Sequence, residues 1–460
     1  MVLGSKWRGG LRRRKIRQLY NQSKWEEAEK QAIALVDCKV NGEFARDIVI
    51  RSLWNLEKWG EVIQFSNEYP SDGGSALARR ARAKLGETEF PEKPDQYASQ
   101  TWNSQNLLDN WYQENDTLWL RHPWGWTYWI MPSNFQLEKT HPSLLALAMN
   151  VLLKPWVSET QLIEVECRNH GGKLALSYSG GVDSTAAAIL LPDDTILAYH
   201  MRSFSSMLSH DLPKQLFEAI KERWGRDVLE IQSNHEKIRT YHGKQTGFST
   251  DYAAGVHLIL LADYLDLNGI SFGTPIDNTW LKKGRKFRDF SETWHWKYWK
   301  DQFARAGLHL VMPINHISEA GALRICEQSD LIDVINSCLR GKGTEYCGEC
   351  WKCFHKNGPL GRDINPQSNE IQNFLTKMPL RTAQHALWAI QLMQLEHLVP
   401  HLSDEFNQSL HWWEHAYLPG LELIQDPWKT VVEERTRKFL PIMERPQLLH
   451  QVDLFPDIPF

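Results

Sequence analysis

The chain has 460 residues, of which 42% are hydrophobic and 23% are charged, and its formal net charge is -4. This length exceeds what one hydrophobic core supports, so it predicts two to four domains. The charge argues against a surface that coats nucleic acid broadly, since such surfaces are basic. No apolar run reaches the roughly 20 residues that a membrane-spanning helix needs, and the basic residues 12–15 are not followed by the apolar region of a signal peptide. We therefore expect a cytoplasmic protein without a membrane partner.

The first segment, residues 1–95, carries a short internal repeat. The sequence Asn21 to Glu27 returns as Asn55 to Glu61, so that Trp25 and Trp59 stand 34 residues apart. That offset is the period of tetratricopeptide repeats, in which each unit is a pair of antiparallel helices. We expect a helical region of this type, which serves either as a surface for a protein or peptide partner or as a helical cap.

Residues 96–170 form a tryptophan-rich connecting segment. Two apolar runs, 117–120 and 126–130, flank a turn-like stretch that contains proline and glycine, which predicts a β-hairpin. Large aromatic rings dominate core burial, so these tryptophans are expected to pack against neighbouring elements in preference to binding a cofactor. Residues 142–153 then predict an apolar helix.

The most informative stretch is a glycine-containing hexapeptide between a predicted strand, 174–176, and a predicted helix, 185–191. Its residues are Ser179, Gly180, Gly181, Val182, Asp183 and Ser184. A glycine pair lets the backbone approach a ligand closely, and the first amides of a helix offer unpaired donors at its positive dipole end. The loop therefore suits a polyphosphate, although it lacks the lysine of Walker-type loops, which argues against γ-phosphoryl transfer. The alternative is an ordinary strand-to-helix turn.

Residues 282–288 hold five cations, and an aromatic stretch follows them. The cations suit either an anionic acceptor or a solvated loop, and neighbouring tryptophans suit a flat base. The spacing of Trp296, Trp299 and Phe303 fits one face of a helix, so it favours a buried stripe over stacking on a ligand.

Four cysteines cluster late in the chain. With the spacing C-x8-C-x2-C-x2-C, they are Cys338, Cys347, Cys350 and Cys353. Four thiolates suit a tetrahedral metal, and zinc is the default because four sulfur ligands leave no open position for a catalytic water. We predict a structural zinc segment over residues 338–360. Disulfides are the alternative, and His355 lies close enough to replace one cysteine ligand.

The last segment, residues 361–460, is expected to be mainly helical, because apolar residues from Ala386 to Leu395 recur at helical spacing. No catalytic motif is found in it. Its expected roles are to shape an acceptor site or to bind another chain.

The glycine loop and the cysteine array together resemble the 7-cyano-7-deazaguanine synthase family of the PP-loop ATP pyrophosphatase superfamily. The resemblance covers about residues 171–360, with Thr195 to His200, Val228 to Ile231 and Ile270 to Gly273 as further strands. It implies an α/β fold, with a parallel sheet covered by helices on both faces over residues 171–337. It also implies a ligase-type enzyme that activates a carboxylate with ATP, releases pyrophosphate and forms an amide or nitrile.

The resemblance also assigns residues to the site. Ser179, Asp183 and Ser184 would take part in catalysis, with Asp183 binding or orienting Mg2+. ATP would be held by Tyr178, Ser179, Gly180, Gly181, Val182, Asp183, Ser184, Thr185 and Gly273. A small-molecule carboxylate acceptor would lie near Asp277, Lys282, Arg285 and Arg288.

The acceptor end departs from the family. Residues 248–252 lack the arginine and asparagine of a family turn, and Glu319 stands where the family commonly has lysine, which predicts a reversed local field. Three alternatives therefore stay open beside nitrile synthesis. They are conjugation to a protein or peptide amine, a transfer-RNA-thiolating enzyme with an iron–sulfur cluster, and an inactive scaffold.

Overall fold

The computed structural model describes residues 2–38, 41–85, 92–204, 208–242, 244–338 and 340–458. The chain divides into two compact units, one formed by Met1–Tyr128 and Asn234–Asp251 and the other by Trp129–Ser233 and Tyr252–Phe460. The first boundary between the units falls between Tyr128 and Trp129, inside a strand, whereas the sequence predicts a change of segment near residue 95. Within the described residues, no helix combines the length and the apolar character that crossing a membrane requires.

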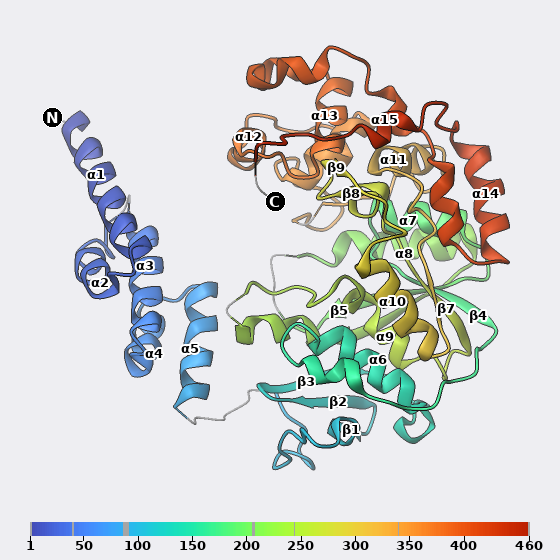
Figure 1. The fold of residues 1–460 in the computed structure, drawn as a ribbon, viewed down its shortest axis with the longest axis horizontal. Helices are drawn as coiled ribbons and strands as arrows, with labels where there is room; N and C mark the ends of the chain where they lie inside the picture. The colour runs from blue at the N-terminus through green and yellow to red at the C-terminus, as the bar shows by residue number, and fades with distance from the viewer. Residues whose placement is uncertain are drawn as a thin grey trace. The chain divides into compact units, whose positions relative to one another are not determined.

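The first unit begins with a helical region, drawn in blue in Figure 1. Its helices are α1 (Val2–Asn21), α2 (Trp25–Ile33), α3 (Gly42–Asn55), α4 (Trp59–Glu68) and α5 (Asp72–Lys84). Small and branched side chains fill the space between them, and Ala28, Val49 and Val62 are completely buried. The predicted helical character of this region is confirmed.

The 34-residue repeat is also present in the backbone. Trp25 and Trp59 are the first residues of α2 and α4, and each follows a lysine whose φ and ψ are close to -85° and 63°. Two residues before each tryptophan the chain has a positive φ, 58° at Ser23 and 57° at Glu57. The same turn therefore precedes both α2 and α4. That this helical region belongs to the tetratricopeptide class stays a prediction.

A tryptophan-lined hairpin follows. Strand β1 (Trp111–Glu114) pairs antiparallel with β2 (Thr117–His122), and β2 neighbours β3 (Gly125–Ile130) in the sheet. The predicted hairpin corresponds to β2 and β3, and β1 is an addition that the sequence did not reveal. Trp119 and Trp126 are buried and meet edge to face with ring centroids 6.3 Å apart, so these rings pack as core residues.

The central sheet is mostly parallel. Its described strands follow the order β1-β2-β3-β6-β5-β4-β7-β10, and the parallel ones are β4 (Lys173–Ser177), β5 (Ile196–Arg202), β6 (Val228–Ser233), β7 (Leu267–Phe272) and β10 (His309–Val311). Strand β3 joins β6 in antiparallel fashion through Trp129 and Ser233. A short two-stranded sheet, β8 (Leu281–Lys282) with β9 (Lys286–Phe287), stands apart from it. The predicted α/β class is confirmed.

The direction of chain progression reverses next to β4. From β4 the chain adds β5 and then β6 on one side, whereas β7 pairs with the other side of β4. In open parallel sheets ligands bind outside the carboxyl ends of the strands at such a switch point. The glycine loop that follows β4 therefore lies at the preferred ligand position of this architecture.

Helices connect and cover the strands of the second unit (Figure 1). They are α6 (Pro142–Leu153), α7 (Val182–Leu190), α8 (Asp211–Trp224), α9 (Val256–Leu260), α10 (Trp294–Arg305) and α11 (Glu319–Glu327). In α10 the hydroxyl of Thr293 accepts the amide of Trp296 as an N-cap. Trp296, Trp299 and Phe303 are buried, which confirms the predicted apolar stripe.

The C-terminal segment is helical, as predicted. A π-helical turn, Cys353–Asn357, leads into it, and short 3-10 turns connect α12 (Asn369–Thr376), α13 (Ala383–Leu392), α14 (Trp428–Phe439) and α15 (Gln447–His450). Helix α13 packs against α11 and the π-helical turn, and α14 packs against α7. These contacts bring the C-terminal segment against the elements that follow β4.

Candidate active site and metal centre

The glycine loop closes on itself through its two serines. Ser179 and Ser184 share a hydrogen bond of 3.0 Å between their hydroxyls, and the Ser184 hydroxyl also accepts the Ser179 amide at 3.2 Å. Gly180 has a φ of 71°, which L side chains rarely adopt. Tyr178 and Thr185 are buried and joined by a 2.9 Å hydrogen bond beneath the loop. The hexapeptide therefore forms a closed turn, with Ser179 exposed and Asp183 partly exposed.

Gly273, at the end of β7, packs directly on the loop. A Cβ added there would lie 3.0 Å from the backbone oxygen of Asp183 and from the Cα of Ser184. Gly273, which follows β7, is thus adjacent to the loop that follows β4, and the sequence predicts that both contact ATP.

We expect Gly273→Ala to destabilise the protein by about 1–3 kcal/mol, because the backbone atoms of Asp183 and Ser184 resist the added methyl group. Thermal or urea unfolding measures this change. The matched control is Gly60→Ala in α4, where an added Cβ meets nothing within 4 Å. An alanine at position 273 that unfolds like the wild type would show that the packing against the loop is loose.

A buried lysine contacts the loop from far along the chain. The ammonium of Lys356 lies 2.7 Å from the Asp183 carboxylate and 2.8 Å from that of Glu319, and its side chain is completely buried. Lys356 belongs to the π-helical turn, 173 residues after Asp183. Burial lowers the pKa of Lys356, but the two carboxylates outweigh that effect and raise it, so the lysine is charged.

A third carboxyl completes this group. Asp277 is completely buried and accepts the backbone amide of Glu319 at 2.8 Å. Burial and the negative charge of Glu319 hold the pKa of Asp277 well above its usual range. Burial acts most strongly on the pKa of Glu319 and raises it, but the interactions with Lys356, His385, Lys352 and His355 together outweigh burial, and the net pKa is lowered. The environment thus favours the anion at Glu319 and protonation at Asp277.

Lys356 corrects the sequence-based interpretation of Glu319. The anion at position 319 predicted a reversed field, since the family commonly has lysine there. In the structure a cation contacts that anion and reaches Asp183 as well. Positive charge is therefore present beside the loop, supplied by a different element of the chain.

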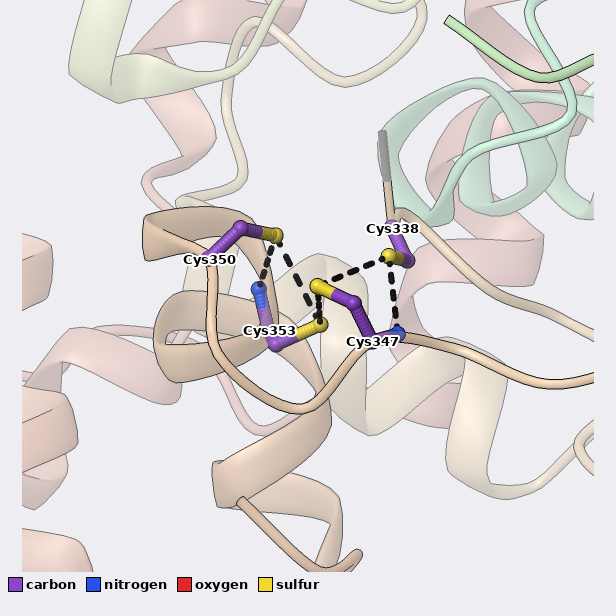
Figure 2. A group of neighbouring side chains, drawn as sticks. All are labelled: Cys338, Cys347, Cys350 and Cys353. Atoms are coloured by element: carbon purple, nitrogen blue, oxygen red, sulfur yellow. Dashed lines mark hydrogen bonds between the residues drawn. The ribbon is translucent and has the colours of Figure 1, made fainter. Parts of the chain in front are cut away.

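The four predicted metal-ligating cysteines lie together (Figure 2). The sulfur atom of Cys347 lies 3.5 Å from that of Cys338 and 3.8 Å from that of Cys353. The sulfur atoms of Cys350 and Cys353 are 3.6 Å apart. All four thiols are free, so the disulfide alternative does not describe this structure.

The spacing of the sulfur atoms fits a zinc ion. Tetrahedral Zn–S bonds of about 2.3 Å place the sulfur atoms about 3.8 Å apart, and the four ligand atoms here lie within 4.8 Å of one another. Their closeness to that value, together with the all-sulfur donor set, means that the cluster could bind zinc or a similar thiophilic metal.

The cysteine cluster is connected to the glycine loop. Ser337, next to Cys338, accepts the backbone amide of Val182 at 3.0 Å. Asn357 donates to the Cys353 sulfur at 3.4 Å and adjoins Lys356. A metal that holds these cysteines would thereby fix both Ser337 and Lys356 against the loop, which is a structural role.

The predicted acceptor residues spread over several environments. Arg285 is buried and donates to the backbone oxygen of Ile458 at 3.0 Å. Arg288 donates to the backbone oxygens of Thr279 at 2.7 Å and of Asn278 at 2.9 Å. Lys282 is an exposed residue of β8. The two arginines thus bind main-chain carbonyls, while Asp277 alone joins the group around Lys356.

His355 is not placed among the cysteine ligands. Its imidazole is buried and lies within 4.8 Å of possible ligand atoms on Glu319 and His385, away from the four-sulfur set. No local spacing predicts this group, because Glu319, His355 and His385 come from three separate elements.

Comparisons with known proteins add one observation. A family model described as a family of unknown function, DUF6395, matches residues 298–448. The matched range includes the four cysteines, Glu319 and Lys356, and it begins after the glycine loop. No curated protein matches the chain.

Proposed function

We propose that the protein is an ATP-dependent adenylating enzyme of the PP-loop type. The observation that carries this proposal is the position of the Ser179–Ser184 loop, which follows a parallel strand, opens α7 and lies at the switch point between β4 and β7. Amides at a helix start and the positive end of its dipole favour a polyphosphate there. The resemblance to 7-cyano-7-deazaguanine synthases supports the same assignment.

The surrounding charges suit attack at the α-phosphorus. An acceptor carboxylate would attack that atom, and the leaving pyrophosphate would carry negative charge that nearby cations stabilise. Lys356 supplies such a cation next to Asp183. Mg2+ bound at Asp183 would add a second positive charge at the phosphates. A nitrogen nucleophile would then displace AMP from the acyl-adenylate and form a C–N bond.

The test is pyrophosphate release from ATP and Mg2+ with 7-carboxy-7-deazaguanine and ammonia. We expect pyrophosphate and AMP from the wild type, and a loss of about 10²–10³-fold with Asp183→Ala, because the residue lies at the phosphate position. Release of ADP and phosphate would contradict the proposal.

The matched control is Asp193→Ala. Asp193 follows the other end of α7, is largely exposed and forms an ion pair with Arg435 at 2.9 Å. Its removal is expected to leave pyrophosphate release unchanged. Equal losses in both variants would mean that the activity responds to the folding of α7 and not to chemistry at Asp183.

A second candidate function is conjugation of the activated group to a protein or peptide amine. It is favoured by the repeated turns before α2 and α4, which build a helical region that resembles partner-binding repeat arrays. The same assay separates the two candidates. Nitrile formation with ammonia alone supports the first, and a covalent adduct on a partner protein supports the second.

A further inference from the structure

A second group of metal-ligating side chains lies outside the four-cysteine cluster. It consists of Glu319 at the start of α11, His355 in the π-helical turn and His385 in α13. Their ligand atoms lie within 4.8 Å of one another. The two imidazole rings are 4.9 Å apart between centroids, and both are completely buried.

The histidines have nitrogen atoms that the protein does not satisfy. Both ring nitrogens of His355 and Nδ1 of His385 are buried without a hydrogen-bond partner. Leaving a buried polar atom unpaired costs about 1–3 kcal/mol, so this arrangement is expensive unless something binds there. Phe374 and Trp388 pack against the rings, which closes the neighbourhood with apolar surface.

His385 is held in the way that metal-ligating histidines are held. Its Nε2 lies 2.9 Å from the backbone oxygen of His355 and therefore donates to it. That bond leaves Nδ1 unprotonated, while Nε2 also lies 3.9 Å from the Glu319 carboxylate. Metal-bound histidines commonly donate their second N–H to a carbonyl or carboxylate in this manner, which fixes the tautomer and the ring orientation.

Glu319 supplies the third donor. Lys356 contacts its Oε2, and a carboxylate has a second oxygen that remains able to bind an ion. Lys352 and Arg381 also bring positive charge to this carboxylate, so a bound ion would share Glu319 with these cations. Ligand atoms that share an ion at about 2.1 Å lie about 3.4 Å apart, and the ligand atoms of the three residues lie within 4.8 Å of one another.

We propose that Glu319, His355 and His385 bind a divalent first-row transition metal ion, separate from the metal of the four cysteines. Two imidazoles and one carboxylate form a donor set that suits such ions. The bound ion would connect α11, the π-helical turn and α13. This site does not depend on ATP binding or on the proposed adenylation.

Cobalt(II) reconstitution tests the proposal, because it reports both sites in the full-length chain. The protein is stripped of metal, loaded with excess cobalt and desalted, and its cobalt is measured by mass spectrometry. We expect about two equivalents in the wild type and about one in His385→Gln. In Cys350→Ser, the one equivalent of cobalt at Glu319, His355 and His385 is expected to remain, while the thiolate-to-cobalt charge-transfer absorption of the cysteine site is lost.

The matched control is His316→Gln. His316 is also completely buried, but its Nε2 bonds the Thr436 hydroxyl at 2.8 Å and it lies outside the cluster. This variant is expected to keep two equivalents. One equivalent in the wild type overturns the proposal without any variant, and so does a His385→Gln protein that folds and still binds two.

Discussion

Replacing Lys356 by methionine is expected to destabilise the protein by about 3–5 kcal/mol, because it leaves buried carboxylates without their cation. Lys356 is completely buried, and its ammonium contacts Asp183 at 2.7 Å and Glu319 at 2.8 Å. Methionine keeps most of the side-chain volume, so the loss of charge dominates the change. Urea or thermal unfolding of the two proteins measures it.

The control removes an ion pair of similar length from the surface. Lys286 contacts Asp453 at 2.8 Å, and both side chains are more than 40% exposed. Exposed pairs contribute about 0–1 kcal/mol, so Lys286→Ala is expected to change stability little. Combining Lys356→Met with Glu319→Gln should recover part of the loss, since it removes one unpaired anion. A Lys356→Met protein as stable as the Lys286→Ala protein would contradict the assigned charges.

Loss of the four-cysteine metal site is expected to have a comparable or larger effect. Cys350→Ser removes one of four sulfur ligands, and we expect it to lose that metal and more than about 4 kcal/mol of stability. The physical reason is that the cluster holds Ser337 and Lys356 against the glycine loop, through Cys338 and Asn357. Metal content and the unfolding midpoint measure the two effects.

Cys167→Ser is the matched control for this prediction. Cys167 is an exposed free thiol of the same unit, and it lies outside the cluster. Its replacement should change neither metal content nor stability. A Cys350→Ser protein that keeps the wild-type metal content and midpoint would show that the four thiols do not bind a structural ion.

The sequence predicted those parts of the site that are contiguous. Around the loop from Ser179 to Ser184, the predicted strand and helix are present as β4 and α7, on either side of the glycine pair. The three closely spaced cysteines, 347–353, likewise share one segment. Local spacing was enough for these features, because the backbone alone brings the side chains together.

The sequence did not predict the features that depend on tertiary packing. Lys356 meets Asp183 across 173 residues, and nothing near either residue announces the pairing. Glu319 could not be interpreted correctly for the same reason, since its compensating cation belongs to the π-helical turn. The basic stretch drew attention to Arg285, but the fold directs this side chain to the carbonyl of Ile458, 173 residues away.

The central claim is that the glycine loop at the β4–β7 switch point holds the phosphates of ATP. Calorimetric titration with a non-hydrolysable ATP analogue and Mg2+ tests it directly, without knowledge of the acceptor. We expect saturable binding by the wild type and its loss in Gly181→Asp, which places an anion in the loop, with the metal content retained. A wild-type protein that binds no analogue, or a variant that binds it equally well, would contradict the account.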